Sequence, residues 1–548
     1  MARPNWLGYL RPHPGSQTPA PLRLAIAAVS GAALSLSFTG FYLAIYSWVC
    51  VGVLLVVVFG ARPRIAFACG FVHALFFVFT SVPWIAAVLS VHGGLSTLGG
   101  WGILLLIASA WGVLIGTFTW SVHRLSQRSV ELACLGAPFL WVSFEFVRAH
   151  LPEISFPWNL LGYPASANLG LLQMTTITGV YGLSFLVVAI NALLAWTDAA
   201  TSPSPKKRVL ILTAAFACIL LIMFVGPRVL PEAHANHIAR AVQPNFPEVQ
   251  QYGGDWFQTH TPDLEELGNL SLRPSQGTLT PDLLVWPEAP APFSFQDTQF
   301  AKLASTLAQR FRGAFLVGSI EWRPPFNSSA SGKSSQHDVA YNSALLFDAQ
   351  GQRLFVYDKI HLVPFGEYEP FPLIHRVVTS VSDEVGGFHK GSPTYAVGKL
   401  PGGYAVGVFI CYEAIYPGEV RRFAANGAQL LINISNDGWF GRSAAAEQHL
   451  RMARVRAVEN RRWIIRDTNS GLTASIDPYG RIFQLLPRDV RAAADLPYDF
   501  RTDATLYTRF GDWFAWLCVL VSILLVASTF VPAPIAPEEK PVGLAVPA

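Results

Sequence analysis

The sequence predicts a two-part protein: a membrane bundle of about eight helices, and an α/β domain placed before the last of them. Three observations support this fold class. Of the 548 residues, 52% are apolar and 14% are charged, whereas a soluble protein carries about 25% charged residues. Six long stretches contain no Asp, Glu, Lys or Arg at all. Between residues 234 and 505, short β-type runs alternate with helical patterns.

The charge-free stretches meet the roughly 20-residue length needed to cross the hydrocarbon core of a bilayer. The first of them is long enough for two spans hinged near Thr39 and Gly40. A further candidate span carries Glu145 and Arg148, which are costly in lipid unless paired, and we expect them to form a structural ion pair. The predicted spans lie near 22–39, 41–60, 65–90, 98–121, 131–150, 171–196, 208–226 and 511–532.

The positions of the basic residues predict the topology, because Lys and Arg collect in short cytoplasmic loops. They precede the first span and follow the second, fourth and sixth: Arg3, Arg11, Arg23, Arg62, Arg64, Arg124, Arg128, Lys206, Lys207 and Arg208. This alternation requires that 131–150 crosses the membrane. The predicted order is a cytoplasmic segment (1–21), a seven-span membrane domain (22–228), an outer domain (234–505), an eighth span (511–532) and a cytoplasmic tail (533–548).

Two partner classes and one processing event are not expected from the sequence. The first apolar run begins some twenty residues in and continues into a second, which is typical of an anchor and not of a cleaved signal peptide. The basic loops account for most of the net charge of +4, so nucleic acid is not an expected partner. Metal binding has little support, since His361, His389 and His449 lack paired ligand spacing and are interpreted as ordinary surface or core histidines.

One cysteine differs from the other five in its setting. Cys50, Cys69, Cys134, Cys218 and Cys518 fall in predicted spans, where cysteine is a small apolar filler. Cys411 is in the outer domain, where thiols tend to be oxidised, and has no partner there. A buried inert cysteine and a nucleophile both fit this position, so the choice depends on its neighbours.

The outer domain contains nine strand-like runs and two clear helices. Several runs are apolar throughout, which indicates strands covered on both faces by helices or by a second sheet. The runs are HIARAVQ, DLLVWPE, AFLVGSI, SALLF, RLFVYDK, YAVGVFICYE, AQLLINISN, WIIRDTNS and LTASID. Residues 296–312 and 443–462 have helical spacing, and in the second a stripe of Ala446, Leu450, Ala453 and Ala457 can lie against a sheet.

Three predicted strands end in reactive groups, and chemistry in layered α/β proteins collects at strand ends. DLLVW leads to Glu288, RLFVYD leads to Lys359, and YAVGVFI leads to Cys411. A thiol near its free pKa needs a base, a cation or a helix N-terminus to become a nucleophile. Glu288 can take the proton, Lys359 can supply positive charge, and a helix expected from Pro417 can add its dipole.

Aromatic residues gather in the predicted loops of this domain. Rings of this kind favour the membrane–water boundary, although we expect about half of them to pack on the domain itself. They are Trp256, Phe257, Phe293, Phe365, Tyr368, Phe371, Trp439 and Phe440.

Four motifs, in their order along the chain, resemble the Glu-Lys-Cys signature of the nitrilase superfamily: WPEAP, YDKIHLVPFGEY, FICYE and SNDGWFG. With spans before and after this domain, the whole chain resembles the bacterial apolipoprotein N-acyltransferases. FEFVRAHLPEISFPWNLLGYP and LYTRFGDWFAW also look like stretches of that family. The resemblance implies a four-layer α/β/β/α sandwich on the outer face of the inner membrane.

The resemblance also implies roles for single residues. Glu288 is then the base, Lys359 the electrostatic stabiliser and Cys411 the nucleophile. Glu367 and Glu413 match supporting carboxylates. Tyr412 and Asn436 match positions on the acyl-binding side, and Trp256 matches a substrate contact across a loop of variable length. One departure is Pro244 in AVQPNFPE, where the family more often has glycine.

The reaction implied by the resemblance is a two-step acyl transfer through a thioester on Cys411, without a cofactor. The donor is a phospholipid such as phosphatidylethanolamine, the acceptor is the α-amino group of a diacylglyceryl-cysteine in an apolipoprotein, and the enzyme is expected to be monomeric. Two alternatives stay open: a membrane-anchored amidase of the nitrilase type, which gives no reason for seven preceding spans, and a non-catalytic binding scaffold.

Overall fold

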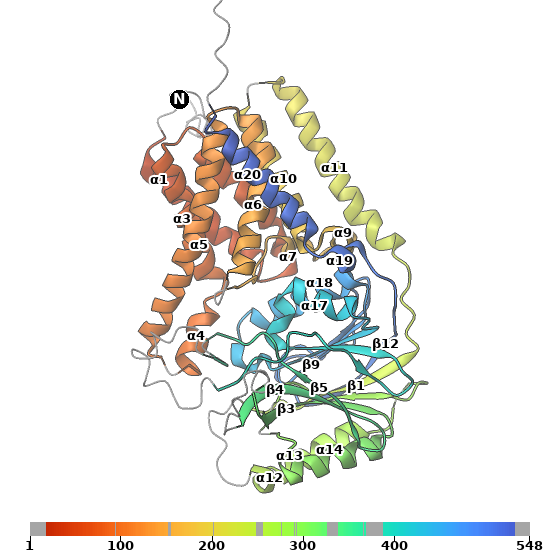
Figure 1. The fold of residues 1–548 in the computed structure, drawn as a ribbon. Coiled ribbons are helices and arrows are strands. Elements are labelled where there is room, and N and C mark those ends of the chain that lie inside the picture. Colours follow the sequence, from red (N-terminus) through yellow and green to blue (C-terminus); the bar gives the residue numbers. More distant parts are fainter. Residues whose placement is uncertain are drawn as a thin grey trace, which may run out of the picture.

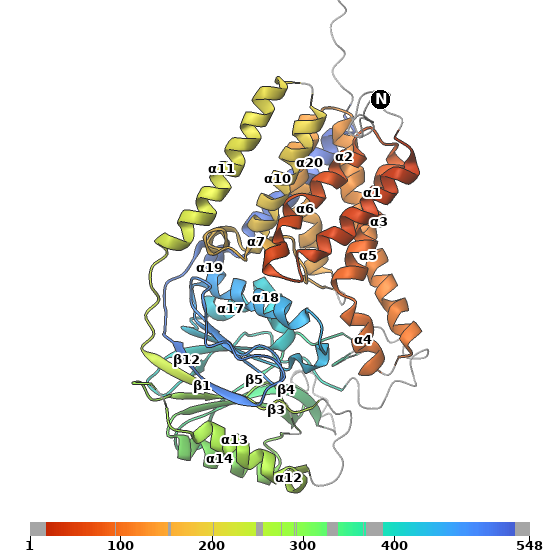
Figure 2. The same ribbon diagram turned by 180° about the vertical axis from the view of Figure 1, so that it is seen from behind.

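The chain forms a bundle of apolar helices seated on a β-sandwich, as Figures 1 and 2 show from opposite sides. The computed structural model describes residues 18–531, except 94, 152–154, 201, 248–255, 276, 290, 292, 326–337, 365 and 369–386. Most of the predicted N-terminal segment, the predicted tail at 533–548, and Phe365 and Phe371 therefore lie outside the described residues. Helix α20 rises from the sandwich back through the bundle.

Among the described residues, five helices have the length and composition of membrane spans, and three shorter apolar helices accompany them. This confirms the predicted fold class of a multi-span helical domain joined to an α/β domain. The helices of the bundle are α1 (Ala20–Leu36), α2 (Cys50–Val58), α3 (Pro63–Ser81), α4 (Trp84–Val91), α5 (Thr97–Ser126), α6 (Val130–His150), α10 (Val180–Ala199), α11 (Pro205–Val229) and α20 (Trp513–Ser528).

Two predicted spans differ from the helices that form. The span expected at 65–90 ends at Ser81 and restarts at Trp84, because a residue that precedes proline, here Val82 before Pro83, is disfavoured in the helical conformation. The span expected at 171–196 begins only at Val180, after Gly179 in a left-handed conformation (φ 64°). Short helices occupy the preceding loop: α7 (Gly162–Ala165), α8 (Leu169–Leu172) and α9 (Thr175–Thr178). A 3-10 helix (η2, Phe41–Trp48) likewise precedes α2.

Small residues let the central helices approach closely. A Cβ atom on Gly70 of α3 would lie 2.4 Å from the carbonyl oxygen of Ile115 on α5, and one on Gly31 of α1 would lie 2.1 Å from that of His73. Helix α11 is different: it is almost entirely exposed, and Gly226 crosses closely over Gly170 of α8. Close packing in the bundle is thus concentrated around α3.

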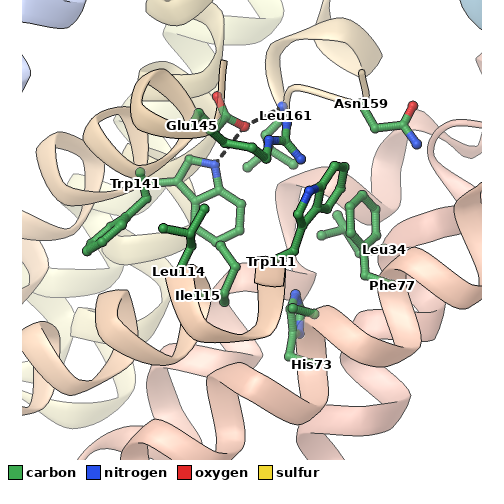
Figure 3. A pocket seen from close by; sticks show the side chains of 13 residues that line it. Leu34, His73, Phe77, Trp111, Leu114, Ile115, Trp141, Glu145, Asn159 and Leu161 are labelled. Carbon is green, nitrogen blue, oxygen red and sulfur yellow. Dashed lines mark hydrogen bonds between the residues drawn. The ribbon is translucent and has the colours of Figure 1, made fainter. Parts of the chain in front are cut away.

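The predicted ion pair between Glu145 and Arg148 is wrong. Within the described chain these two side chains do not form a salt bridge but bind separate partners around a small cavity (Figure 3). Glu145 Oε1 accepts hydrogen bonds from Trp141 Nε1 (2.9 Å) and from the main-chain N–H of Leu161 (2.7 Å). Arg148 donates to the carbonyl oxygen of Trp158 (3.0 Å). The loop after α6 therefore supplies main-chain partners to both charges, which sequence spacing within one helix does not reveal.

The α/β domain is a sandwich of two six-stranded sheets in the described chain. The first sheet has the order β12-β1-β2-β3-β4-β5: Ala492–Tyr498, His237–Gln243, Leu283–Val285, Ala314–Arg323, Val339–Phe347 and Arg353–Asp358. The second has the order β11-β10-β9-β8-β7-β6: Ile482–Phe483, Ala474–Ile476, Ile464–Thr468, Leu430–Ser435, Ala405–Ile410 and Gly398–Lys399. Two of the strands that lead to the reactive residues run parallel to a neighbour, β2 beside β1 and β3 and β7 beside β8, whereas β5 runs antiparallel to β4.

Helices cover the outer face of each sheet, which gives the four layers that the resemblance implied. Helices α13 (Thr261–Leu272) and α14 (Thr298–Phe311) cover the first sheet, while α17 (Pro417–Ala425) and α18 (Ala445–Asn460) lie between the second sheet and the bundle (Figure 1). Short helices α12 (Trp256–Thr259) and α19 (Leu506–Phe510) lie at the two ends of the domain. The core between the sheets includes Leu283, Leu316, Val408 and Ile432.

Helix α18 is buried on two sides because it contacts both halves of the protein. Leu450, Ala453 and Ala457 of the predicted stripe pack in the core of the sandwich, as expected. Met452 and Val455 pack instead in the core of the bundle. Polar contacts reinforce this second face: Gln448 Oε1 accepts from Trp158 Nε1 (2.6 Å), and Glu459 Oε1 accepts from the main-chain N–H of Val180 (2.9 Å).

The loop aromatics divide between the two halves of the protein. Trp256, Phe257 and Phe293 are buried together on the α13–α14 side of the sandwich. These three therefore pack on the domain itself, as we expected for about half of the loop aromatics. Trp439 and Phe440 lie in the 3-10 turn η4 (Asp437–Phe440), where they contact His92 and Trp84 of the bundle.

A substitution tests the close approach of α3 and α5. We expect Gly70→Leu to lower the thermal midpoint of the detergent-purified protein, because overpacking of a tight contact typically costs about 1–3 kcal/mol. Gly102→Leu on α5 is the matched control, since a Cβ atom there has no neighbour within 4 Å. Equal midpoints for the two variants would contradict the packing described.

Candidate functional site

Glu288, Lys359 and Cys411 meet between the two sheets. Each follows the carboxyl end of a strand: Glu288 comes after β2, Lys359 directly after β5, and Cys411 directly after β7. Their exposed fractions are 6%, 1% and 6%. The first two strands belong to one sheet and the third to the other, so the site forms only when the sandwich closes.

A buried network joins the base and the lysine. Lys359 Nζ donates to Glu288 Oε1 (2.9 Å) and to Glu367 Oε1 (2.8 Å). Asn342 Nδ2 lies within 2.7 Å and 2.8 Å of the same two oxygens. Glu288 Oε2 accepts from the main-chain N–H of Asn436 (2.8 Å). The ammonium group is therefore held between two carboxylates, and one of them faces Cys411.

Sequence reasoning missed Asn342. It lies in the middle of β4, where a polar residue interrupts a run of buried apolar side chains. Such an interruption was a usable signal, because a buried amide must find hydrogen-bond partners. Its partners come from two loops distant in sequence, so the pattern within β4 does not identify them.

Glu413 links the loop of the lysine to the loop of the cysteine. Its Oε1 accepts from Tyr357 OH (2.8 Å) and from the main-chain N–H groups of Ile360 (2.7 Å) and His361 (3.1 Å). Its Oε2 accepts from the N–H of Ile410 (2.7 Å), the residue before Cys411. Burial raises the pKa of Glu413 to about 7, while these donors act in the opposite direction. The side chain thus sets the position of both loops and does not contact the lysine.

Electrostatics at the site keep Cys411 protonated and Lys359 charged. Burial raises the pKa of the Cys411 thiol, and the charge of Glu288 raises it further, whereas Lys359 lowers it. Burial alone would lower the pKa of Lys359, but Glu288 and then Glu367 outweigh it, so the pKa is well above its ordinary value. The resting site therefore holds a thiol beside a carboxylate that can accept its proton.

The three residues assigned to substrate binding lie in different places. Asn436 contacts Glu288 through its main chain. The ring of Tyr412 stacks on Phe156, in the loop after α6, with centroids 6.3 Å apart. Trp256 packs against Phe246 and Phe293 in the aromatic cluster beside α12. Its role as a substrate contact remains a prediction.

An aromatic layer lies between Cys411 and the helices of the bundle. Phe156 stacks on Trp158 (5.8 Å between centroids), and Trp158 lies 5.7 Å from the ring of His449. Tyr416 OH donates to the carbonyl oxygen of Ser155 (2.9 Å). Residues 155–158 thus supply a wall of the site on the side of the bundle.

Family models match both halves of the chain. The model described as the apolipoprotein N-acyltransferase N-terminal domain matches residues 30–193, and the carbon-nitrogen hydrolase model matches residues 240–496.

Curated relatives match most of the chain. The apolipoprotein N-acyltransferase of Geobacter metallireducens is 34% identical over 92% of this chain and 95% of its own. That of Bradyrhizobium diazoefficiens is 33% identical over 70% of each chain. Among solved structures, a carbon-nitrogen hydrolase from Helicobacter pylori aligns with 47% of this chain and 89% of its own, at 16% identity and a TM-score of 0.35.

The charge environment of Cys411 predicts how its alkylation depends on pH. We expect the rate of iodoacetamide modification at Cys411, followed by peptide mass spectrometry, to rise with a midpoint above that of an ordinary thiol. Glu288→Gln should lower this midpoint, because it removes a negative charge that raises the pKa of the thiol, and Lys359→Met should raise it. A midpoint that moves upward in Glu288→Gln would contradict the arrangement.

Proposed function

This chain belongs to the apolipoprotein N-acyltransferases, and from that premise we propose that Glu288, Lys359 and Cys411 carry its acyl transfer. The observation that supports this assignment is the ion pair of Lys359 and Glu288 (2.9 Å), buried at the strand ends where Cys411 begins its turn. A carboxylate, an ammonium group and a thiol in one buried place are the parts that thioester chemistry requires.

In the first step, Cys411 takes an acyl chain from a phospholipid of the phosphatidylethanolamine kind. The thiol proton passes to Glu288 while sulfur attacks the ester carbonyl carbon. Lys359 and main-chain N–H groups stabilise the oxyanion that develops. The carbon–oxygen bond then breaks, Glu288 returns the proton to the leaving alkoxide, and a lysophospholipid departs from the thioester.

In the second step, the α-amino group of a diacylglyceryl-cysteine attacks the thioester. Glu288 accepts a proton from the amine as the carbon–nitrogen bond forms. The carbon–sulfur bond breaks, and the proton held by Glu288 restores the thiol of Cys411. The products are an amide on the apolipoprotein and the free enzyme, so no cofactor is required.

Glu367, Glu413, Tyr412 and Asn436 have supporting parts in this proposal. Glu367 shares the ammonium group with Glu288 and keeps the lysine charged. Glu413 sets the positions of the lysine and cysteine loops. The ring of Tyr412, stacked on Phe156, and the neighbourhood of Asn436 form the side of the site nearest the bundle, where an acyl chain can arrive from lipid. Trp256 is proposed as a substrate contact from the family resemblance alone.

We further propose that the protein is a monomer of the bacterial inner membrane with its sandwich on the periplasmic face. The arrangement of basic residues supports this orientation. Arg23 donates to the carbonyl oxygen of Phe59 (3.0 Å), and Arg124 to that of Thr529 (3.2 Å). These contacts group the basic loops at the end of the bundle that is remote from the sandwich (Figure 2). Basic loops favour the cytoplasm.

Mass measurement of the intact protein tests the chemistry. After incubation with phosphatidylethanolamine, we expect wild type to gain the mass of one acyl chain on Cys411, and Cys411→Ala to gain none. Glu288→Gln should fold and lose the adduct, because no group is left to accept the thiol proton. Addition of a diacylglyceryl peptide should remove the adduct and yield the N-acyl peptide.

The same experiment separates the alternatives. A membrane-anchored amidase predicts release of free fatty acid or no reaction with the lipid. A scaffold predicts that Cys411→Ala supports lipoprotein maturation in cells as well as wild type does. Absence of an adduct in wild type across several lipid compositions contradicts the proposal.

Labelling of single cysteines tests the orientation. Gln350, at the turn between β4 and β5, and Gln127, at the turn between α5 and α6, are both exposed. In a variant without its other reactive thiols, we expect a membrane-impermeant maleimide to label Gln350→Cys in cells with a permeable outer membrane. Gln127→Cys should react only after the inner membrane is opened. The reverse pattern excludes a periplasmic sandwich.

A further inference from the structure

The main chain of Cys411 has an unusual conformation. Its φ is 49°, in the left-handed region, which side chains other than glycine, asparagine and aspartate rarely adopt. A residue held there is strained and persists only where its surroundings enforce the conformation. Two contacts flank it: Glu413 accepts from Ile410 before it, and His449 contacts the carbonyl oxygen of Cys411 itself.

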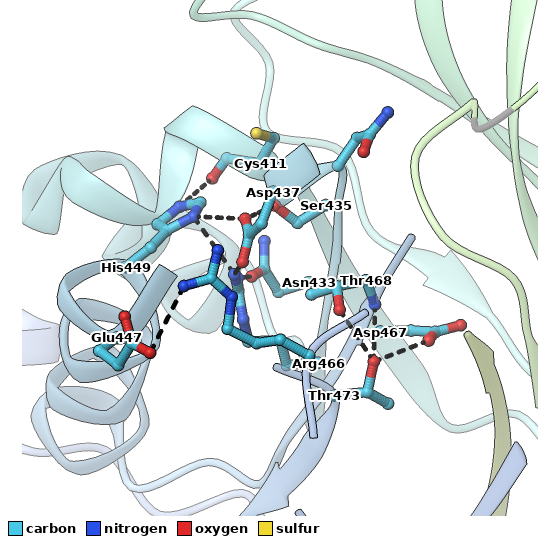
Figure 4. A network of polar contacts seen from close by, with 12 residues as sticks. Cys411, Asn433, Ser435, Asp437, Glu447, His449, Arg466, Asp467, Thr468 and Thr473 are labelled. Carbon is cyan, nitrogen blue, oxygen red and sulfur yellow. Dashed lines mark hydrogen bonds and ion pairs between the residues drawn. The ribbon is translucent and has the colours of Figure 1, made fainter. Parts of the chain in front are cut away.

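His449 holds that carbonyl from helix α18. Its Nε2 lies 2.9 Å from the carbonyl oxygen of Cys411, and because a carbonyl only accepts, Nε2 carries the proton. Burial and the charge of Arg466 lower the pKa of His449 against the opposing effect of Asp437. Figure 4 shows the sulfur of Cys411 on the opposite side of the residue from this contact.

Two charged residues fix the other side of the imidazole. Asp437 Oδ1 lies 3.0 Å from Nδ1 of His449, and Arg466 Nη2 lies 3.2 Å from the same nitrogen. Arg466 pairs with Asp437 Oδ2 (2.6 Å), and Ser435 donates to Oδ1 (2.8 Å). Despite burial, Arg466 and then His449 hold the pKa of Asp437 below its ordinary range. His449, Asp437 and Arg466 are at most 1% exposed.

The network returns to the strand that carries the cysteine. Arg466 donates to the side-chain oxygen of Asn433, and Asn433 Nδ2 donates to the carbonyl oxygen of Phe409 (3.0 Å) on β7. Phe409 is two residues before Cys411. A closed ring therefore runs from β7 through β8, β9, η4 and α18 back to Cys411 (Figure 4). The geometry leaves room for Asp437 only because a glycine follows β9: a Cβ on Gly471 would lie 2.4 Å from its Oδ2.

We propose that His449, held by Asp437 and Arg466, is the positioning residue that keeps the nucleophile Cys411 in its left-handed conformation. This role rests on the proposed function of Cys411. Its ring does not need to touch substrate. Its single task is to donate from Nε2 to the carbonyl oxygen of Cys411.

The contact has two consequences for the chemistry. It fixes the rotation of the main chain from which the sulfur projects, and a misplacement of about 1 Å can cost about 100-fold in rate. The C=O and N–H of a trans peptide point in opposite directions, so the bond also fixes the direction of the Tyr412 N–H. That N–H lies in the first turn of a 3-10 helix (η3, Cys411–Ile415), where N–H groups lack partners within the helix.

Two substitutions of His449 distinguish the hydrogen bond that it donates from the volume that its side chain fills. The amide of Gln can place a donor where Nε2 lies, so we expect His449→Gln to form the acyl adduct at a rate within a few-fold of wild type. His449→Leu keeps the volume but donates nothing, and it should be slowed about 100-fold. Asn460→Ala is the matched control, since Asn460 is also buried on α18 and bonds to Arg456 and Thr508 away from the network.

The readouts are the rate of adduct formation on Cys411, the rate of its alkylation by iodoacetamide, and the thermal midpoint. We expect Asn460→Ala to lose stability but to retain the wild-type adduct rate. Equal adduct rates for His449→Leu and wild type, or equally slow rates for the Gln and Leu variants at matched stability, overturn the proposal.

The alkylation rate of Cys411 tests the positioning role of His449 separately from the acyl transfer proposed above. If wild type forms no adduct but alkylation of Cys411 still changes in His449→Leu and is restored in His449→Gln, the positioning role stands and the acyl transfer fails. If neither rate responds to His449, the positioning role fails whatever the adduct shows.

Discussion

The buried ion pair of Lys359 with Glu288 is the interaction on which the rest of the site depends. An ammonium group that leaves water loses several kcal/mol of solvation, which a single carboxylate repays only in good geometry. Here Glu367 supplies a second carboxylate, and Asn342 donates hydrogen bonds to both acids. The ends of β2 and β5 and the middle of β4 are consequently held in one arrangement. Strand β7 brings Cys411 to the same place.

Helix α18 lies at the interface between the two halves of the protein. One face of α18 belongs to the core of the sandwich and the other to the core of the bundle, and its first turns also carry His449 toward Cys411. His449 therefore connects this interface directly to the main chain of Cys411. In the proposed mechanism the interface is part of the catalytic architecture as well as a means of attachment.

The three central residues of the site could be predicted from the sequence, whereas most of their hydrogen-bond partners could not. Glu288, Lys359 and Cys411 stand out because each follows an apolar strand, and that local signal survives folding. Asn342 finds its partners in two distant loops, and the ring through Asp437, His449 and Arg466 joins side chains from several elements. No spacing rule in the sequence identifies such contacts, and His449 was interpreted as an ordinary histidine.

Strand β12 was missed because it is rich in alanine and contains Pro497, which an edge strand tolerates. The breaks in the membrane helices follow local signals, Pro83 and Gly179, whereas the partners of Glu145 and Arg148 do not.

The hydrogen bonds from Trp158 to Gln448 and from Val180 to Glu459 join the bundle to the sandwich. In the proposed reaction, such contacts set the distance of the Cys411 sulfur from the ends of the membrane helices. A substrate whose acyl chains stay in the bilayer can react only if its reacting atom reaches that distance from the membrane. The proposed donor offers an ester carbonyl near its glycerol backbone, and the proposed acceptor offers an amine a few bonds from another glycerol. Both reacting atoms then lie at nearly the same depth, so one sulfur can serve both in turn.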